Sequence, residues 1–196
     1  MNNLNNKIIV ITGASDGIGA EAARELHAMG ATVVIVGRSA EKTKKIANEL
    51  NSKYFVADFA KFSEVRDLAD KLNKELPRID VLINNAGGVF GSRELTVDGH
   101  EKTMQVNHYS HFLLTNLLLD TLIKSKATVI NSSSIANRLY SDFDIENIEL
   151  ENRYSPNKAY GNAKLANILF TRELNNRFHD KGINTAAFHP GNVATN

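Results

Sequence analysis

The sequence predicts an α/β fold in which a doubly wound, parallel β-sheet is covered by helices on both faces. Short runs rich in Val and Ile alternate along the chain with longer segments of helical periodicity. The short runs are almost continuously apolar, as expected of strands buried on both faces of a parallel sheet. Strict alternation of strand and helix, with right-handed crossovers, then gives the doubly wound arrangement.

Each predicted element is bounded by residues that start or stop such an element. Strands are expected at 7–11, 32–36, 54–57, 80–83, 127–130 and 183–188. Helices are expected at 17–29, 40–50, 63–76, 99–124 and 156–180. Gly30 closes the first helix and Pro77 follows the third. The acidic stretch 137–155 is expected to be irregular, as either a solvated surface loop or a loop beside the substrate.

Composition and charge exclude several classes of function. Lys plus Arg number 23 and Asp plus Glu number 22, so no basic face for nucleic acid is expected. The absence of cysteine excludes disulfides, thiolate metal sites and a cysteine nucleophile. Residues 1–6 are polar, and the apolar runs are too short to cross a bilayer. We therefore expect a cytoplasmic protein with no membrane partner, and a single domain over residues 1–196.

A glycine-rich loop joins the first strand to the first helix. Its glycines, Gly13, Gly17 and Gly19, allow a sharp turn, close approach of a pyrophosphate to the backbone, and tight packing of the helix on the sheet. The helix N-terminus offers N–H groups and partial positive charge to phosphates. The spacing differs from the common G-x-G-x-x-G of dinucleotide-binding folds. The loop nevertheless predicts a phosphate site, which also includes Ser15, Asp16 and Ile18.

Tyr160 and Lys164 form a candidate acid/base pair, because residues four apart share one face of a helix. A free phenol titrates near ~10, too high for a base at neutral pH. An ammonium about 4 Å away contributes roughly 4 kcal/mol at an effective dielectric constant of about 20. That energy corresponds to lowering the phenol pKa by about three. We therefore expect Lys164 to lower the pKa of Tyr160 and make it a general acid/base.

Tyr154 and Lys158 have the same spacing and are an alternative pair. Pro156 disfavours helical geometry for Ser155, which is instead a good N-cap with proline at the first helical position. Tyr154 is then outside the helix, so Tyr160 is preferred.

Together these motifs resemble those of the short-chain dehydrogenases/reductases. The loop is similar to the family's T-G-x-x-x-G-x-G, residues 84–87 match N-N-A-G, residues 160–167 resemble Y-x-x-S-K-L-A-N, and residues 190–195 resemble P-G-x-V-x-T. The pattern is closest to the group of retinol dehydrogenases, the WW-domain oxidoreductase and protochlorophyllide reductase. The resemblance implies a Rossmann-like fold and hydride transfer between a nicotinamide and a small-molecule carbonyl or alcohol, expected to be hydrophobic.

The resemblance assigns the remaining catalytic roles. Ser134 is expected to hold the substrate oxygen, with Ser133 as the alternative. Asn107 is expected to bend its helix and to hold a water that links Lys164 to solvent. Lys164 is also expected to bind the nicotinamide ribose. His108 and His111 share a helix face without a third ligand at metal-binding spacing, so no metal site is predicted.

The resemblance also assigns the cofactor contacts. Asp58 is expected beside the adenine, although it could instead cap the next helix. In the family an acidic residue at the end of the second strand selects NAD; that place here is Gly37, and Arg38 follows it. A guanidinium there favours NADP(H) through charge-assisted hydrogen bonds to a 2′-phosphate. Asn84 is expected to tie neighbouring strands together. The other expected contacts are Asn85, Ala86, Gly87, Pro190, Gly191, Val193 and Thr195.

The last expectations concern the oligomeric state and the C-terminal part of the chain. The resemblance implies a homodimer or homotetramer, with Leu113, Leu117 and Leu118 as candidate contacts that core packing would explain equally well. Members of the family continue past the P-G-x-V-x-T element with a substrate-covering segment and a last strand, which this sequence is expected to lack. The alternatives to an enzyme are a non-catalytic NADP(H)-binding sensor and a Rossmann-like methyltransferase, for which the Tyr–Lys pair has no use.

Overall fold

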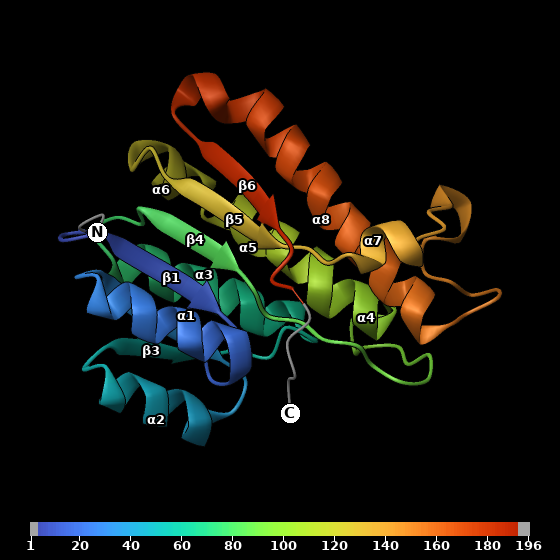
Figure 1. Cartoon of the computed structure of the whole chain (residues 1–196), viewed down its shortest axis with the longest axis horizontal. Helices are drawn as coiled ribbons and strands as arrows, with labels where there is room; N and C mark the ends of the chain where they lie inside the picture. The colour runs from blue at the N-terminus through green and yellow to red at the C-terminus, as the bar shows by residue number, and fades with distance from the viewer. Residues whose placement is uncertain (1–3, 192–196) are drawn as a thin grey trace.

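A computed structural model describes residues 4–191 (Figure 1). Six parallel strands form one sheet with the order β3-β2-β1-β4-β5-β6. The strands are β1 (Ile8–Thr12), β2 (Thr32–Gly37), β3 (Lys53–Val56), β4 (Val81–Asn84), β5 (Thr128–Ser132) and β6 (Asn184–Phe188). The chain winds outward from β1 in one direction and then, from β4, in the other. The predicted doubly wound sheet is confirmed, and the strand order reverses between β1 and β4.

The helices lie on both faces of this sheet (Figure 1). The α-helices are α1 (Gly17–Ala28), α2 (Ala40–Glu49), α3 (Phe62–Glu75), α4 (Lys102–Met104), α5 (Ser110–Leu117), α6 (Leu119–Lys124), α7 (Ala136–Leu139) and α8 (Pro156–Phe178). A π-helical turn, η1 (Gln105–Tyr109), joins α4 to α5, and two 3₁₀ turns are η2 (Ile145–Asn147) and η3 (His179–Lys181).

Alternate residues of the central strands build two separate cores. Ile9 and Ile35 face α1 and α2, in a cluster that includes Ala23 and Ile46. Their neighbours along the strands face the opposite way, in a cluster to which α3, α5 and α8 contribute. That second cluster includes Val10, Val34, Leu82, Leu68, Leu114, Leu118 and Phe170. Burial on both faces explains why the strands are apolar at nearly every position.

The helix expected at 99–124 is confirmed over most of its length, but it starts later and is not one regular α-helix. Gly99 has φ +84 and lies in a turn, and helical structure begins only at Lys102. The Asn107 side chain donates to the carbonyl of Thr103, four residues earlier, at 2.8 Å. That bond competes with the backbone hydrogen bonds of the helix. It lies at the π turn, where each backbone N–H bonds the carbonyl five residues earlier instead of four.

Residues 137–155 are less irregular than expected. Helix α7 overlaps the start of this stretch, and η2 lies within it. Helix α7 packs directly on α8 at Gly161. A Cβ at Gly161 would lie 2.9 Å from the carbonyl oxygen of Ala136 and 2.8 Å from the Ser141 nitrogen. Only glycine permits this approach, which fixes the start of the stretch beside the residue that follows Tyr160.

Strand β6 forms one edge of the sheet, and most of its residues are exposed. Among the proposed dimer contacts, Leu118 is fully buried in the core, so it cannot form part of an interface. Leu117 is exposed on the neighbouring surface. In the part of the chain that the structure describes, no helix is long and apolar enough to cross a membrane.

Candidate active site

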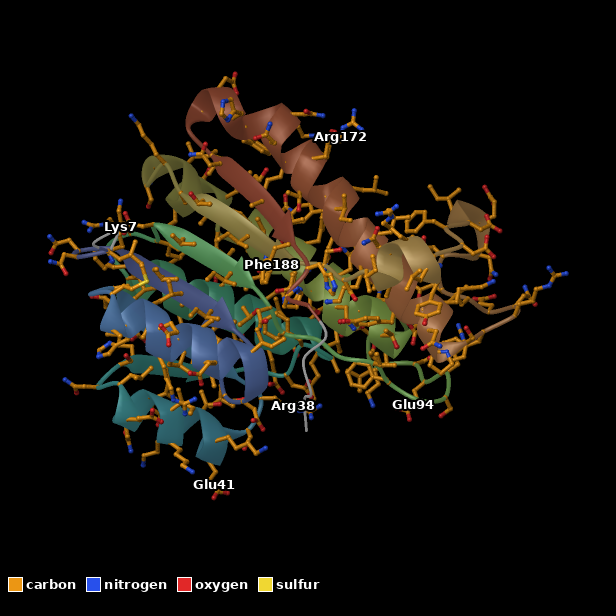
Figure 2. All side chains as sticks on the ribbon, viewed as in Figure 1. Lys7, Arg38, Glu41, Glu94, Arg172 and Phe188 are labelled. Atoms are coloured by element: carbon orange, nitrogen blue, oxygen red, sulfur yellow. The ribbon has the colours of Figure 1, made fainter. Side chains whose placement is uncertain are left out.

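The carboxyl ends of the strands meet at one edge of the sheet. Figure 2 labels Phe188 at the end of β6 and Arg38 just beyond β2, whereas Lys7 marks the opposite, amino end of the sheet. Two adjoining hollows of about 480 and 490 Å³ lie along the carboxyl edge. We call them the Arg38 hollow and the Tyr160 hollow after one lining residue of each. Both are lined by Gly13, Asp16, Ala86, Gly87 and Gly88, so they form one continuous cleft.

The glycine-rich loop forms the floor where the two hollows join. Gly13 has φ +67, and a Cβ there would lie 2.7 Å from the Cα of Ala86. A Cβ on Gly19 would lie 2.3 Å from the Gly13 carbonyl oxygen. The Asp16 carboxylate caps α1 by accepting from the Gly17 nitrogen at 2.8 Å. The loop thus presents backbone and a helix N-terminus to the cleft, which fits the phosphates of a dinucleotide.

Residues 84–88 form a shelf beside this loop, held from below by Thr12. The Thr12 hydroxyl accepts from the backbone nitrogens of Asn85 at 2.9 Å and Ala86 at 3.0 Å. The Asn85 side chain returns a bond to the Thr12 carbonyl at 2.9 Å. Asn84 ties β4 to its neighbours as expected, because its amide donates to Asn131 at 2.8 Å and to Thr115 at 3.0 Å.

Tyr160, Lys164 and Ser134 come together at the far side of the cleft. Tyr160 and Lys164 both line the Tyr160 hollow from α8. The Lys164 ammonium lies 5.2 Å from the centre of the Tyr160 ring and donates to the Ser132 carbonyl at 3.2 Å. The Ser134 hydroxyl is close enough to the phenol to act on the Tyr160 pKa. The expected pair therefore faces one cavity from one helix.

The protein's own groups do not make Tyr160 acidic, and that expectation is wrong. Burial raises the pKa of Tyr160, and the hydrogen-bonding interaction with Ser134 offsets this rise only in part. Burial also lowers the pKa of Lys164 to about 8. The physical reason is that both charged forms lose solvation in the cleft wall, and the ammonium points towards a backbone carbonyl rather than the phenol oxygen.

Ser134, rather than Ser133, has a hydroxyl that faces the phenol. Ser133 lines the Tyr160 hollow, but its hydroxyl is buried and donates to the Lys164 carbonyl at 2.9 Å. Ser134 Oγ accepts from the Ala136 nitrogen at 3.2 Å and keeps its proton for another partner. The geometry favours Ser134 for contact with a substrate oxygen, and gives Ser133 the task of bracing α8.

Asn107 sits in the π turn and is fully engaged with its surroundings. Its side chain accepts from the Gly88 nitrogen at 3.1 Å and donates to the Gly88 carbonyl at 2.9 Å. Its backbone carbonyl accepts from Asn167 at 3.0 Å and from His111 at 3.1 Å. Two side chains thus donate to the Asn107 carbonyl, and the expected relay water stays a prediction. The expected bend at Asn107 is present as the π turn.

The alternative pair Tyr154–Lys158 is separated as expected. Ser155 caps α8 by accepting from the Lys158 nitrogen, and Pro156 is the first helical residue. Tyr154 lies outside the helix and donates to the Gly91 carbonyl at 3.2 Å, whereas Lys158 pairs with Asp142 at 2.7 Å. The two side chains therefore do not form an acid/base pair.

Charged groups gather in the Arg38 hollow. Arg38, Ser15 and Asp58 line it as expected, together with Ser39 and Lys42. Lys42, from the first turn of α2, forms an ion pair with Asp16 at 2.7 Å. This pair and the capping bond to Gly17 lower the pKa of Asp16. One Asp58 oxygen accepts from the Ala60 nitrogen at 3.0 Å, so Asp58 stabilises the turn before α3 while facing the hollow.

The last predicted element is only partly described. Pro190 lines the Tyr160 hollow, and Gly191 follows it with φ +90. Val193 and Thr195 lie outside the described residues. Ile18 lines the Tyr160 hollow beside Gly17 and Gly19.

Sequence reasoning missed Thr12 and Lys42. Thr12 precedes the glycines and looks like a residue that ends a strand. Nothing in the sequence indicated that its hydroxyl bonds the backbone of a distant turn. Lys42 lies in the first turn of the helix that begins two residues after Arg38, so its closeness to the Arg38 hollow could have been inferred from the sequence. Within residues 4–191, no group of three or more His, Asp and Glu side chains could hold a metal ion.

The fold and this cleft define an α/β dinucleotide-binding protein, and comparison with known proteins gives its family. The model of the short chain dehydrogenase family matches residues 7–196. The chain belongs to this family of oxidoreductases, which use a nicotinamide cofactor and act on small molecules. It is 41% identical to retinol dehydrogenase 12 of Homo sapiens over 198 residues, covering 97% of this chain and 62% of that protein.

Two solved structures show how close the fold is. A crystal structure of a protein from Mycobacterium paratuberculosis has a TM-score of 0.84 and 38% identity, over 97% of this chain and 70% of that one. The RhlG/NADP active-site complex from Pseudomonas aeruginosa has a TM-score of 0.81 and 32% identity, over 98% of this chain and 75% of that one. The chain thus spans about three fifths of the human relative and about three quarters of RhlG.

Proposed function

We propose that this protein is an NADP(H)-dependent oxidoreductase that interconverts a carbonyl and an alcohol, with Tyr160 as the acid/base. The observation that carries the proposal is that Tyr160 and Lys164 line the same cleft as the glycine-rich loop, with the Ser134 hydroxyl interacting with the Tyr160 phenol. A phosphate cradle alone would suit many nucleotide-binding proteins. A phenol, an ammonium and a hydroxyl at its far end are suited to proton transfer at a substrate oxygen.

Each of these side chains has a separate part in the proposed reaction. A nicotinamide, when bound, donates or accepts the hydride. In the reducing direction Ser134 Oγ–H donates a hydrogen bond to the substrate oxygen, and the Tyr160 hydroxyl gives it a proton. Lys164 stays anchored to the Ser132 carbonyl, which keeps its positive charge beside the Tyr160 ring as the phenolate develops. In oxidation the phenolate accepts the alcohol proton.

The charges of the Arg38 hollow support a preference for NADP(H). Arg38 and Lys42 place two cations there, and the only carboxylates among its lining residues are Asp16 and Asp58. Lys42 already neutralises Asp16, while Asp58 accepts from a backbone nitrogen. A 2′-phosphate is stabilised by a guanidinium through paired, charge-assisted hydrogen bonds. The RhlG complex, whose fold this chain shares, contains NADP.

The proposed substrate class follows the relatives. The human relative is named a retinol dehydrogenase, and this chain exposes Leu139 and Ile145 on the segment that precedes α8. Following the relative's name, the proposed substrate class is an apolar carbonyl or alcohol.

A homodimer is also proposed. Phe112 on α5 and Leu169 on α8 are 49% and 47% exposed, and Phe112 packs at 5.2 Å against Phe170 of α8. The two helices therefore present adjoining apolar side chains, as an isologous interface requires. Light scattering of the purified protein, compared with the Phe112→Glu variant, tests this; a monomeric wild type would contradict it.

The test of function has two stages. Calorimetric titration with NADPH and NADH measures binding, and we expect NADPH to bind more tightly. A panel of apolar aldehydes and ketones with NADPH, followed by absorbance at the nicotinamide band, then measures turnover. Binding without turnover of any substrate would instead favour a nucleotide-binding sensor. Failure to bind either nucleotide would overturn the proposal.

A further inference from the structure

A fully buried histidine joins the two groups that hold the shelf of residues 84–88. Thr12 holds the shelf through the backbone nitrogens of Asn85 and Ala86. Asn107 holds its other end through both backbone groups of Gly88. His111, on α5, lies between these holders, with Nε2 3.2 Å from the Thr12 hydroxyl and Nδ1 3.1 Å from the Asn107 carbonyl.

The surroundings of His111 fix which ring nitrogen carries the proton. A carbonyl oxygen only accepts, so Nδ1 must donate to Asn107. The side chain is 1% exposed, and burial lowers its pKa to about 3, so the ring is neutral near pH 7. Nε2 is then a buried acceptor that needs a donor.

The Thr12 hydroxyl is the donor that Nε2 needs. Its oxygen already accepts two backbone N–H groups, and its single proton can reach either His111 or the Ile83 carbonyl at 3.3 Å. Ile83 lies within β4, where strand pairing supplies donors to carbonyl oxygens. Donation to His111 therefore satisfies every member of the group.

The Asn107 carbonyl connects this group of hydrogen-bonded residues to Lys164. The Asn167 amide donates to the Asn107 carbonyl at 3.0 Å and to the Ser132 carbonyl at 3.0 Å. The Ser132 carbonyl also accepts from Lys164. A shift of the Asn107 carbonyl would therefore displace Asn167, and through it the anchor of the ammonium.

We infer that His111, as the neutral Nδ1–H tautomer, is a positioning residue that locks the cofactor shelf in register with the Asn107 turn and Lys164. This inference rests on the proposed function for its catalytic meaning. It predicts that loss of the His111 links weakens both nucleotide binding and turnover, because the shelf and the lysine anchor move independently once the links are gone.

Nuclear magnetic resonance of ¹⁵N-histidine-labelled protein tests the tautomer without any turnover. The sequence contains six histidines, and the His111 signals are those lost in His111→Phe. We expect a protonated Nδ1 and a bare Nε2, unchanged between pH 8 and pH 5. A proton on Nε2, or titration of His111 in that range, would overturn the inference.

Binding and kinetics of variants test the positioning role. His111→Phe fills the space without either bond, and losing two hydrogen bonds should weaken NADPH binding and lower kcat, each by about tenfold. His111→Asn keeps an N–H near the Nδ1 position, and His111→Gln keeps an amide near Nε2, so each should recover part of both losses. Thr12→Val should weaken NADPH binding as His111→Phe does.

The matched control is Leu114→Val, which removes one methylene from a fully buried side chain on the same helix outside the polar group. It should lower Tm while leaving the NADPH Kd and kcat unchanged. If His111→Phe lowers Tm but, like Leu114→Val, changes neither constant, His111 is only structural and the inference is wrong. If the wild type binds no NADPH, the proposed function fails, whereas the tautomer measurement still decides the hydrogen-bond assignment.

Discussion

The Lys164 ammonium points at the Ser132 carbonyl and lies 5.2 Å from the centre of the Tyr160 ring. Lys164 is 4% exposed and pays a desolvation cost that lowers its pKa to about 8. The pair is therefore held in place by the fold at a cost in stability, as expected of a group kept for chemistry.

The stability of a Lys164→Met variant should reveal this cost. Below pH 8 the lysine is charged in both the folded and unfolded protein, so the cost is fully present. Between pH 8 and the ordinary lysine pKa of 10.5 the folded protein has lost a proton that the unfolded chain retains, so the free energy of unfolding of the wild type rises with pH. We expect Lys164→Met to be more stable than the wild type at pH 7 by on the order of 1–3 kcal/mol, with the difference narrowing above pH 8. Chemical denaturation at several pH values measures it, and a constant difference would contradict the account.

The sequence predicted the strands and their order of motifs well, because buried parallel strands are apolar at nearly every position and each motif follows a strand. It failed at Asn107, where a side chain competes with the backbone of its own helix. Periodicity over 99–124 carries no trace of such a bond. The turn became predictable only through the family resemblance, which assigned a bend to Asn107.

The site was predicted best where spacing along one element fixes geometry. Tyr160 and Lys164 share a helix, so their meeting in one cavity follows from residues alone. Thr12 and His111 lie 99 positions apart, and their contact depends on how α5 packs against β1. The pKa of Tyr160 was predicted with the wrong sign because a distance between charges was assumed and burial was left out.

Nucleotide preference should depend on Arg38. The Arg38→Asp variant replaces a guanidinium with a carboxylate that would repel a 2′-phosphate, so NADPH binding should weaken by about tenfold to a hundredfold while NADH binding changes little. Calorimetric titration with both nucleotides measures this. Arg24→Ala is the control, because Arg24 pairs with Glu49 away from the cleft. An equal loss for the two nucleotides would show that Arg38 supports the loop rather than the phosphate.

The phosphate cradle should not tolerate a methyl group at Gly19. In Gly19→Ala the added Cβ would lie 2.3 Å from the Gly13 carbonyl, so the loop must open. We expect NADPH binding to be lost, with a drop in stability of about 1–3 kcal/mol. Gly91→Ala is the matched control, since a Cβ there meets nothing within 4 Å. Retained nucleotide affinity in Gly19→Ala would exclude the loop as the phosphate site.

Acid sensitivity should be reduced by removing His111. Its pKa of about 3 in the folded protein lies below the ordinary histidine pKa of 6.5, so the unfolded chain binds the extra proton as pH falls through that window. The free energy of unfolding therefore decreases as the pH is lowered from about 6.5 to 3. Denaturation of His111→Phe should show a shallower decline over this range than the wild type does. Parallel declines would mean that His111 is not held neutral.

The central claim is that the Tyr160 hydroxyl transfers the proton, and paired measurements on Tyr160→Phe and Tyr154→Phe test it most directly. Each variant loses one hydroxyl from a tyrosine that stands four residues before a lysine. We predict that Tyr160→Phe lowers kcat with NADPH by at least about a thousandfold while its NADPH Kd stays within a few-fold of the wild type. Tyr154→Phe should keep most of the turnover. A Tyr160→Phe protein that turns over at a rate comparable to the wild type would contradict the account.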